Sequence, residues 1–167
     1  MELTFEYLHR EYYRKMVAYT STFPRVSGAE REEVAHDALV HAYLARDKYD
    51  PARPLNAWVY AVARNHILDL LRSRGPDTVP YEDALGVAEE ARSGGSDEEA
   101  VLVVAVRFEI ERMDDRDRRI AMLVFLEGMT SRDAARALGI PAGTIRWRVH
   151  EIRRRLAKAL AERGMKQ

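Results

Sequence analysis

The chain has 167 residues, 47% of them apolar, and its 27 Lys and Arg balance 27 Asp and Glu to give a formal net charge of zero. This length suffices for one or two small packed domains, and the lack of cysteine excludes disulfides and thiolate-based zinc or catalytic sites. Because no apolar run approaches the length of a membrane span and the charged start does not resemble a secretion signal, we expect a cytoplasmic protein without membrane insertion.

The balanced charge is distributed unevenly along the chain. Residues 1–74 carry 11 basic and 10 acidic side chains, residues 75–100 carry 1 and 8, and residues 101–167 carry 15 and 9. Within the last segment, residues 141–167 contribute 8 basic and 2 acidic side chains. Nucleic-acid binding requires a local basic surface and not a basic whole, so the C-terminal segment is the candidate for contact with DNA.

Three segments of helical spacing are expected to form a first domain, residues 1–74. They run from Leu3 to about Thr20, from Ala29 to Lys48 and from about Pro54 to Arg72. The side chains expected to face the core are Phe5, Leu8, Tyr12, Val17, Tyr19, Val34, Ala38, Tyr43, Leu44, Trp58, Val62, Leu68 and Leu71.

A linker is predicted at residues 75–100, which concentrate Pro, Gly, Ser and acidic residues without a sustained period. This segment leaves room for a short helix near Tyr81 to Ala91. Helical segments at Ala100–Met113 and Asp115–Glu127 then open a second domain, residues 101–167. Since no segment shows strand alternation, the predicted fold is all-α: two small helical domains, loosely tethered by a flexible linker.

The segment from Thr130 onward predicts a helix, a tight turn and a second helix. Thr130 and Asp133 form a capping box at the start of the first helix. Gly139 supplies the left-handed residue that ends it, and Pro141 fits the first turn of the second helix. One apolar stripe of the second helix is expected to pack against the first helix: Ile145, Val149, Ile152, Leu156 and Leu160.

The rest of the second helix is dense in guanidinium groups. A rigid helix fits the major groove of DNA, and arginines there bond phosphates and guanine edges. The alternative is an ordinary solvated face on a core helix. The capped first helix, the glycine turn and the one-sided arginines together favour DNA binding. The candidate readers are Thr144, Arg146, Trp147, Arg148, His150, Arg153 and Arg154.

Two signatures occur in order along the chain. The first comprises Trp58-Val59-Tyr60, Ala63-Arg64-Asn65, Asp69 and Arg72. The second comprises Leu126-Glu127-Gly128-Met129, Ala134-Ala135, Leu138-Gly139, Pro141, Gly143-Thr144-Ile145 and Arg148-Val149-His150. Together they resemble bacterial RNA polymerase sigma factors of the extracytoplasmic-function (ECF) group, which contain only the second and fourth conserved sigma regions.

The resemblance implies a transcription initiation subunit, not an enzyme and without a cofactor, that serves a stress or envelope-signal regulon. Its partners would be core RNA polymerase, promoter DNA and an inhibitory anti-sigma factor. Glu33, His36 and Asp37 fall where the family carries its motif for the polymerase clamp helices. The residues that would read and open the promoter element nearer the start site (the near element) are Tyr49, Asp50, Arg53, Asn56, Trp58, Arg64 and Asn65. The second domain would read the farther element.

Three positions depart from the family pattern. His36 replaces the usual glutamine, Trp147 stands where a serine is common, and Glu151 stands where arginine is frequent. Trp147 either contacts a thymine methyl or a sugar in the groove, or packs beside Leu160 or the neighbouring helix; both interpretations stay open.

Two other functions also stay open. A helix-turn-helix regulator would bind duplex DNA independently of polymerase, and a sigma mimic would titrate an anti-sigma factor. No metal site is expected, because only Asp37 and His41 share a face and a third ligand is not evident. His66 and Asp69 lie near neither a nucleophile nor a glycine-rich cradle, which argues against hydrolytic catalysis.

Overall fold

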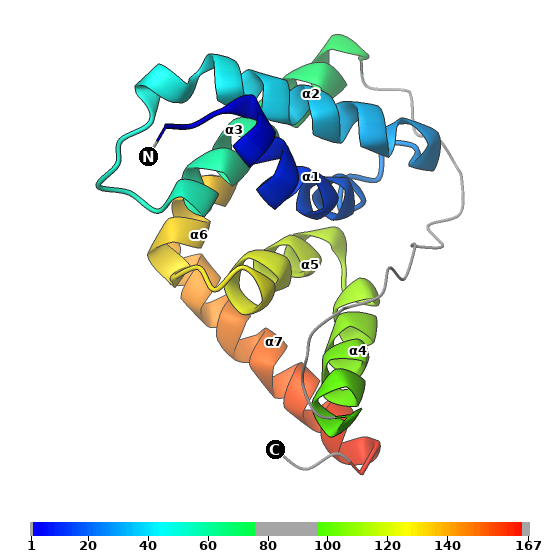
Figure 1. The fold of residues 1–167 in the computed structure, drawn as a ribbon. Helices are drawn as coiled ribbons and strands as arrows, with labels where there is room; N and C mark the ends of the chain where they lie inside the picture. Colours follow the sequence, from blue (N-terminus) through cyan, green and yellow to red (C-terminus); the bar gives the residue numbers. More distant parts are fainter. Residues whose placement is uncertain (1, 76–96, 165–167) are drawn as a thin grey trace.

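The computed structural model describes residues 2–75 and 97–164, and of residues 97–100 it describes the backbone only. Within these ranges the fold is all-α, as predicted, and no strand occurs. The first domain contains α1 (Phe5–Thr20), α2 (Arg31–Leu44) and α3 (Leu55–Ser73), and the second contains α4 (Asp97–Glu111), α5 (Asp115–Ala121), α6 (Ser131–Leu138) and α7 (Ala142–Glu162) (Figure 1). The predicted short helix near residues 81–91 lies outside the described residues.

Local signals set several helix boundaries. Thr4 caps α1 by accepting a hydrogen bond from the Tyr7 amide at 3.2 Å, as expected for a threonine that satisfies an orphan donor of the first turn. The second predicted segment is divided into a 3₁₀ turn, η1 (Gly28–Glu30), then α2, then a second 3₁₀ turn, η2 (Arg46–Lys48). At η1, the Glu30 carboxylate accepts from the Ser27 amide at 3.0 Å and completes a capping box.

The core of the first domain differs in part from the prediction. Six of the predicted core residues are buried as expected: Leu8, Tyr12, Tyr19, Val34, Ala38 and Leu71. The prediction for Leu44 is wrong: it is 67% exposed, because it ends α2 where the chain turns outward into η2. Six others pack at the edge of the core and are only partly buried: Phe5, Val17, Tyr43, Trp58, Val62 and Leu68.

Of the residues predicted to bury on α3, only Leu71 is fully buried, and the rest of the buried side differs from the prediction. The buried side chains of α3 include Tyr60, Ala63 and Ile67, whereas Trp58 and Val62 lie half-buried. The reason is tertiary, since α3 packs against α2 on one side and α6 on another. A helix with two neighbours buries more than the single stripe that a periodicity argument identifies.

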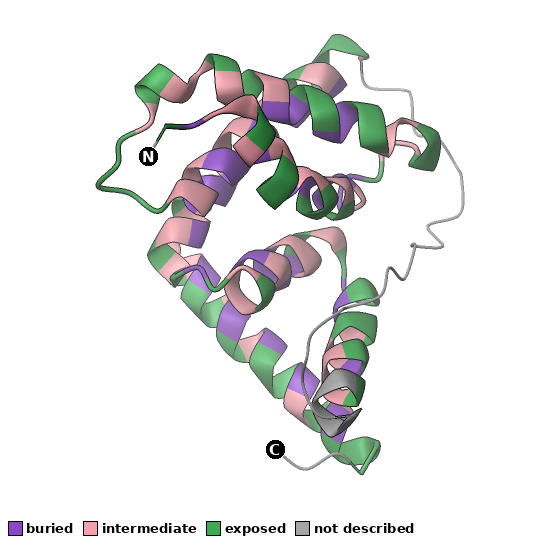
Figure 2. Ribbon diagram, viewed as in Figure 1, coloured by how far each residue is buried: buried purple, intermediate pink, exposed green. Residues whose placement is uncertain are grey.

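The second domain follows the predicted order with one local irregularity. Helix α5 continues as a π-helical turn, η3 (Met122–Leu126), which the Glu127 amide closes by donating to the Met122 carbonyl at 3.0 Å. The predicted apolar stripe of α7 is confirmed, since Ile145, Val149, Ile152, Leu156 and Leu160 are all buried. Figure 2 shows these buried positions on the side of α7 that faces the other helices.

The two domains are in contact, whereas the sequence predicts loose tethering. Helix α6 lies along α3, and the buried apolar side chains form one cluster that continues from the first domain into the second (Figure 1). Among the described residues no helix is both long and apolar enough to cross a bilayer. Of the candidate DNA-binding side chains, Arg64 of α3 lies at this boundary, against Gly139 at the end of α6.

Candidate nucleic-acid interface

The helix-turn-helix forms by the local devices that its sequence indicates. Thr130 caps α6 by accepting from the Asp133 amide at 3.1 Å, and its hydroxyl donates to the Asp133 carboxylate at 2.8 Å. The Asp133 carboxylate accepts from the Thr130 hydroxyl and not from the Thr130 amide, so only the Thr130 half of the predicted capping box is formed. Gly139 ends α6 in the left-handed conformation, with φ of 63° and ψ of 34°, and its amide donates to the Ala135 carbonyl. Pro141 then precedes the first turn of α7.

Most of the candidate readers lie on the exposed side of α7. Arg146, Trp147, His150, Arg153 and Arg154 are exposed, and Thr144 is half-buried. Trp147 is 59% exposed, so it does not pack in the core, and its contact with the DNA groove stays a prediction. These side chains lie on the sides of α7 away from its buried apolar stripe. A helix that reads the major groove requires this arrangement.

Arg148 differs from these neighbours because it is held by a buried carboxylate. Its guanidinium lies 2.9 Å from Asp117 of α5, which is only 6% exposed, and Arg155 approaches the same carboxylate at 3.4 Å. Buried carboxylates are rarely left unpaired, because an isolated charge in the interior is strongly destabilising. Asp117 therefore fastens α7 to α5, and Arg148 acts in this structure as an anchor of the recognition helix.

Two other arginines of α7 have partners on their own domain. Arg154 pairs with Glu151 at 2.8 Å, and Arg153 lies over the Phe125 ring at 5.7 Å. Both remain exposed to solvent, so these contacts are weak and are replaceable by phosphate. Arg146 is exposed at the start of α7, close to Gly143.

The candidates for the near element fall into separate groups. At the loop before α3, Tyr49 donates its hydroxyl proton to the Arg53 carbonyl at 2.8 Å and its ring lies 5.3 Å from that of Trp58. Asp50 closes the same loop by accepting from the Ala52 amide at 3.0 Å and pairs loosely with Arg53 at 3.7 Å. The loop is thus a closed turn that presents a half-buried aromatic pair.

Asn56 and Arg64 face the second domain. The Asn56 side-chain amide donates to the Glu127 carbonyl at 3.2 Å. The Arg64 guanidinium lies against Gly139, where a Cβ added to the glycine would be 3.2 Å from Nη1. Asn65 is exposed and lines a shallow pocket between α2 and α3. The structure therefore does not bring these three together with the Tyr49 loop in one open surface.

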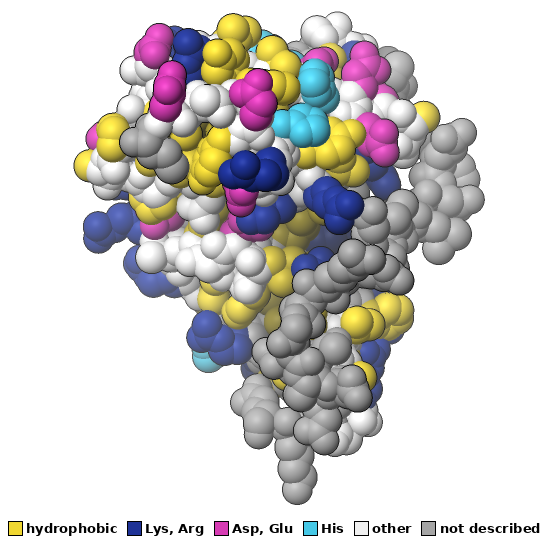
Figure 3. All heavy atoms as spheres, viewed as in Figure 1, with side chains coloured by type: hydrophobic (Ala, Val, Ile, Leu, Met, Phe, Trp, Pro, Cys, Tyr) yellow, Lys and Arg dark blue, Asp and Glu magenta, His cyan; other side chains and the backbone are white. Residues whose placement is uncertain are grey.

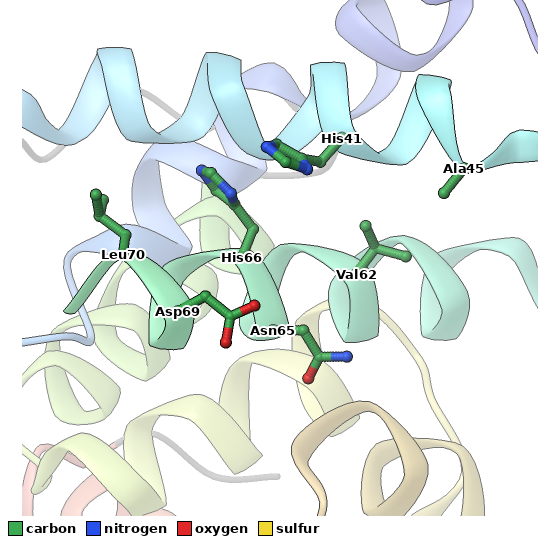
Figure 4. Close-up of a pocket in the computed structure, with 7 residues that line it drawn as sticks. All are labelled: His41, Ala45, Val62, Asn65, His66, Asp69 and Leu70. Atoms are coloured by element: carbon green, nitrogen blue, oxygen red, sulfur yellow. The ribbon is translucent and has the colours of Figure 1, made fainter. Parts of the chain in front are cut away.

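The pocket of about 400 Å³ contains a pair of stacked histidines, His41 of α2 and His66 of α3, with ring centroids 4.1 Å apart. Figure 4 shows His66 pointing to His41, whereas Asn65 and Asp69 point away from α2. Burial, followed by the neighbouring His41, lowers the pKa of His66 from its usual 6.5. Among the described residues no cluster of three potential metal ligands is present.

The candidate polymerase-binding residues Glu33, His36 and Asp37 are all exposed on α2. His36 stands edge-on to Phe5, with ring centroids 5.6 Å apart, and lies 6.0 Å from the His9 ring. The exposed acidic side of α2 therefore lies beside the half-buried rings of Phe5 and His9 on α1. On the face drawn in Figure 3, acidic and histidine side chains occur mainly over the first domain, and Lys and Arg gather toward the domain boundary.

Three side chains with important contacts were not predicted from the sequence. Asp117 was not singled out, and neither were Arg118 and Arg119, which reach the first domain. Arg118 donates to the Ser21 carbonyl at 2.6 Å, and Arg119 donates to the Thr22 carbonyl at 3.0 Å. Their one local signal is the charge-dense start of α5, which does not reveal partners about a hundred residues away.

An exposed, arginine-lined second helix beside a three-helix first domain defines a two-domain helix-turn-helix protein. Residues 8–76 match the family model described as Sigma-70 region 2, and residues 104–156 match Sigma-70, region 4. The chain belongs to the ECF sigma factors of RNA polymerase.

Known members cover most of the chain. It is 31% identical to the ECF sigma factor SigF of Caulobacter vibrioides over 83% of this chain and 74% of that protein. It is 30% identical to the sigma factor CnrH of Cupriavidus metallidurans over 77% of this chain and 72% of that protein. The solved structure of RpoE in complex with the anti-sigma factor NepR from Bartonella quintana has the same fold, with a TM-score of 0.67, 22% identity, and coverage of 94% of this chain and 96% of that one.

Proposed function

We propose that this protein binds core RNA polymerase and directs it to promoters by contacting two separate DNA elements. The observation that carries the proposal is an exposed arginine-rich face on α7 in a chain whose other domain matches Sigma-70 region 2. The protein acts as a binding subunit and not as an enzyme. Its site of action is the cytoplasm, where bacterial polymerase and DNA are found.

The farther element is contacted by the exposed side of α7. Arg146, Arg153 and Arg154 supply donors for phosphates and guanine edges, and Trp147 supplies an apolar surface for a thymine methyl or a sugar. His150 lies on the same exposed side. Thr144 and Arg148 support this face from half-buried positions, so the specificity of the helix resides mainly in the other five residues.

The near element is contacted by the Tyr49 loop and the adjoining face of α3. Extruding a base from the stack requires a few kcal/mol, roughly, and stacking on an aromatic side chain offsets part of that cost. Tyr49 and Trp58 provide such a surface, with Asp50 and Arg53 closing the loop beside it. Asn56, Arg64 and Asn65 would then hold the strand along α3.

One short recognition helix is insufficient for promoter choice. Each base pair that it reads contributes about 1 to 3 kcal/mol of discrimination, and only a few pairs are within its reach. Because the first domain has 11 basic and 10 acidic side chains, it would attract single-stranded DNA only weakly by charge. Recognition of the near element therefore depends on polymerase holding the first domain in place.

The polymerase contact is assigned to the exposed acidic side of α2. Glu33 and Asp37 are one helical turn apart and face solvent together with His36. The relatives RpoE and CnrH are known in complex with NepR and with the cytosolic domain of CnrY, respectively. By analogy with these relatives, we propose an anti-sigma factor as the regulator of this chain.

Co-elution with purified core polymerase tests the assignment. Glu33→Lys combined with Asp37→Lys should abolish co-elution in size-exclusion chromatography, because the double variant reverses two exposed charges on the contacting face. Glu11→Lys combined with Asp47→Lys makes the same change in net charge at exposed positions outside α2 and should leave co-elution intact. Failure of the unchanged protein to co-elute with polymerase would overturn the proposed function.

A further inference from the structure

Helix α4 has an exposed apolar face that the function proposed above does not use. Val101, Val104 and Phe108 are 53%, 60% and 46% exposed, respectively. Their spacing of three and four residues places them on one side of the helix, and we call this set the α4 stripe. The other side of α4 packs on α5 and α7. A contiguous apolar patch on a surface marks a place where another apolar surface packs.

Basic side chains border the α4 stripe. The guanidinium groups of Arg112 and Arg163 lie 5.6 and 5.0 Å from the centre of the Phe108 ring, and Arg107 is exposed beside it. Arg163 also pairs with Glu109 at 2.6 Å, whereas Arg112 makes no ion pair within residues 2–75 and 101–164. The α4 stripe is therefore suited to an apolar surface that carries carboxylates at its edge.

The chain itself contains such a surface just before α4, in residues 81–91. The apolar residues of this segment recur at the spacing of one helix face: Tyr81, Ala84, Leu85 and Ala88. The same spacing places four carboxylates on the other sides of that helix: Glu82, Asp83, Glu89 and Glu90. Residues 75–100 as a whole carry 8 acidic side chains and 1 basic one, which complements the arginines beside the α4 stripe.

The two apolar sets match in register when the segment runs antiparallel to α4. Residues 92–96, which include Gly94 and Gly95, would form the turn between them. A connection of this length is usual for an αα-hairpin, in which two antiparallel helices pack side by side. Both sets are spaced by three and four residues counted outward from this turn, so every facing pair is apolar. The pairs are Ala88 with Val101, Leu85 with Val104, and Tyr81 with Phe108.

The ends of the described ranges are compatible with this path. Arg25 donates to the Gly75 carbonyl, so the chain leaves α3 against the first domain. Figure 1 shows that α4 begins at the end of the molecule remote from the first domain and runs back toward it. The intervening residues 76–96 must therefore cover the length of α4, which is about 22 Å for its 15 residues. A path along the exposed face of α4 meets this requirement.

We propose that residues 81–91 form a helix that docks on the α4 stripe and makes an αα-hairpin with α4. The docked helix shields the α4 stripe from solvent and brings carboxylates near Arg107 and Arg112. Residues 76–80 would then be the only tether between the two domains, with a reach of at most about 18 Å. The proposal concerns the free chain and holds whether or not the protein binds polymerase.

Disulfide formation between introduced cysteines tests the register, because the chain has no cysteine of its own. Ala88→Cys combined with Val101→Cys places two thiols at a facing pair. Glu90→Cys combined with Val101→Cys is the control, since residue 90 would lie on the far side of the docked helix. The two loops differ by only two residues, so their closure entropies are similar. Titration with glutathione should give a roughly tenfold larger equilibrium constant for the facing pair, whose geometry suits a disulfide.

Cleavage by a glutamate-specific protease tests the docking without introduced cysteines. Glu89 and Glu90 would lie within the docked helix, which must open before a protease cleaves it. Val104→Asp puts a carboxylate on the α4 stripe opposite an acidic helix and should raise the cleavage rate at these two sites roughly tenfold. Leu44→Asp makes the same kind of change at another exposed aliphatic residue, which is 67% exposed at the end of α2, and should leave that rate unchanged.

Both measurements use the free protein, so their outcome is independent of polymerase binding. A favoured facing pair together with faster cleavage in Val104→Asp supports the hairpin. Equal equilibrium constants for the two cysteine pairs would overturn it, and so would disulfides that join two molecules, which would place a second copy of the chain on the α4 stripe. Equal cleavage rates in Val104→Asp, Leu44→Asp and the unchanged protein would also overturn it.

Discussion

The two DNA-facing surfaces of this molecule are supported and exposed in different ways. Helix α7 is fastened from behind by the buried Asp117, and its arginine-bearing side is open to solvent. Helix α3 has its candidate readers at a domain boundary, where Asn56 and Arg64 are already in contact with the second domain. The first surface is open to solvent, whereas part of the second is in contact with the chain's own second domain.

This difference matches the physical demands of the two elements. Duplex DNA presents its groove edges without distortion, so a rigid and permanently exposed helix suits it. An opened strand exists only after base pairs are broken, so permanent exposure of its binding surface offers no advantage. Variants that act on one surface and not on the other are therefore the most informative.

Asp117→Ala should break the support of α7 and have the largest effect on stability. The substitution leaves Arg148 and Arg155 without their shared carboxylate, and both are 27% or more exposed, so water compensates in part. We expect a loss of about 1 to 3 kcal/mol in the free energy of unfolding, measured in urea. Asp115→Ala, which removes a more exposed pair with Arg118, is the control and should lose less. Equal losses in the two would contradict the anchoring role.

Arg146→Ala should affect DNA binding by α7 and not the stability of the fold. It removes an exposed donor at the start of α7 and should weaken binding of the farther element by roughly 1 to 3 kcal/mol, with unchanged unfolding. Fluorescence anisotropy with a duplex selected from random sequence measures the affinity. Lys158→Ala, further along the same helix, should have a smaller effect on that affinity.

Arg148→Ala provides the contrast within α7. Because Arg148 pairs with Asp117, its loss should lower stability as well as DNA affinity, and polymerase binding should persist. A variant that lost affinity for the farther element with no change in unfolding would show instead that Arg148 leaves Asp117 to read DNA.

Local signals allowed the helix-turn-helix to be predicted from sequence. The Thr130 cap, the left-handed Gly139 and the stripe from Ile145 to Leu160 depend on neighbours a few residues apart, and the structure contains all three. The partner of Arg148 and the outward turn of Leu44 depend on distant elements. Periodicity carries no information about them, because it cannot tell which of two helices will cover a given side.

The buried side of α3 illustrates the same limit. Trp58 and Val62 have the spacing of a core stripe, yet Tyr60 and Ala63 are the buried residues, and the Tyr60 ring packs against that of Tyr19 on α1. Likewise, the resemblance identifies Asn56 and Arg64 as candidate readers but does not reveal that the second domain engages them. Contacts between domains depend on shape and charge over the whole molecule.

His66→Gln should reduce the loss of folding stability that the unchanged protein shows as the pH falls. Burial and His41 lower the His66 pKa below 6.5, while Asp37 and Asp69 act in the opposite direction. The unfolded chain therefore takes up the proton more readily, and stability is lost as the pH falls from about 6.5 toward the folded pKa.

The expected contribution is small, because His66 is only partly buried and solvent weakens the interactions that shift its pKa. Urea unfolding at pH 7.5 and 5.5, as a rough bracket of the shift, should show a smaller pH dependence in His66→Gln than in the unchanged protein. His150→Gln, at an exposed position on α7, should retain the original dependence. The same dependence in all three proteins would rule out His66 as the source.

Glu151→Gln should have the smallest effect on stability and a distinct effect on DNA. The carboxylate pairs with the 72% exposed Arg154, so the pair contributes only a few tenths of a kcal/mol, roughly. Removing its charge should strengthen binding to nonspecific duplex DNA about two- to threefold at low salt. Weaker binding to the selected duplex alone would identify Glu151 as a reader of cytosine.

Mapping of transcript 5′ ends tests the central claim most directly. Purified core polymerase transcribes fragmented genomic DNA of its own host with and without this protein, and the start sites are sequenced. The account predicts new start sites that appear only with the protein, that share two conserved elements upstream, and that disappear with Glu33→Lys combined with Asp37→Lys. Identical start sites in the presence and absence of the protein would contradict it.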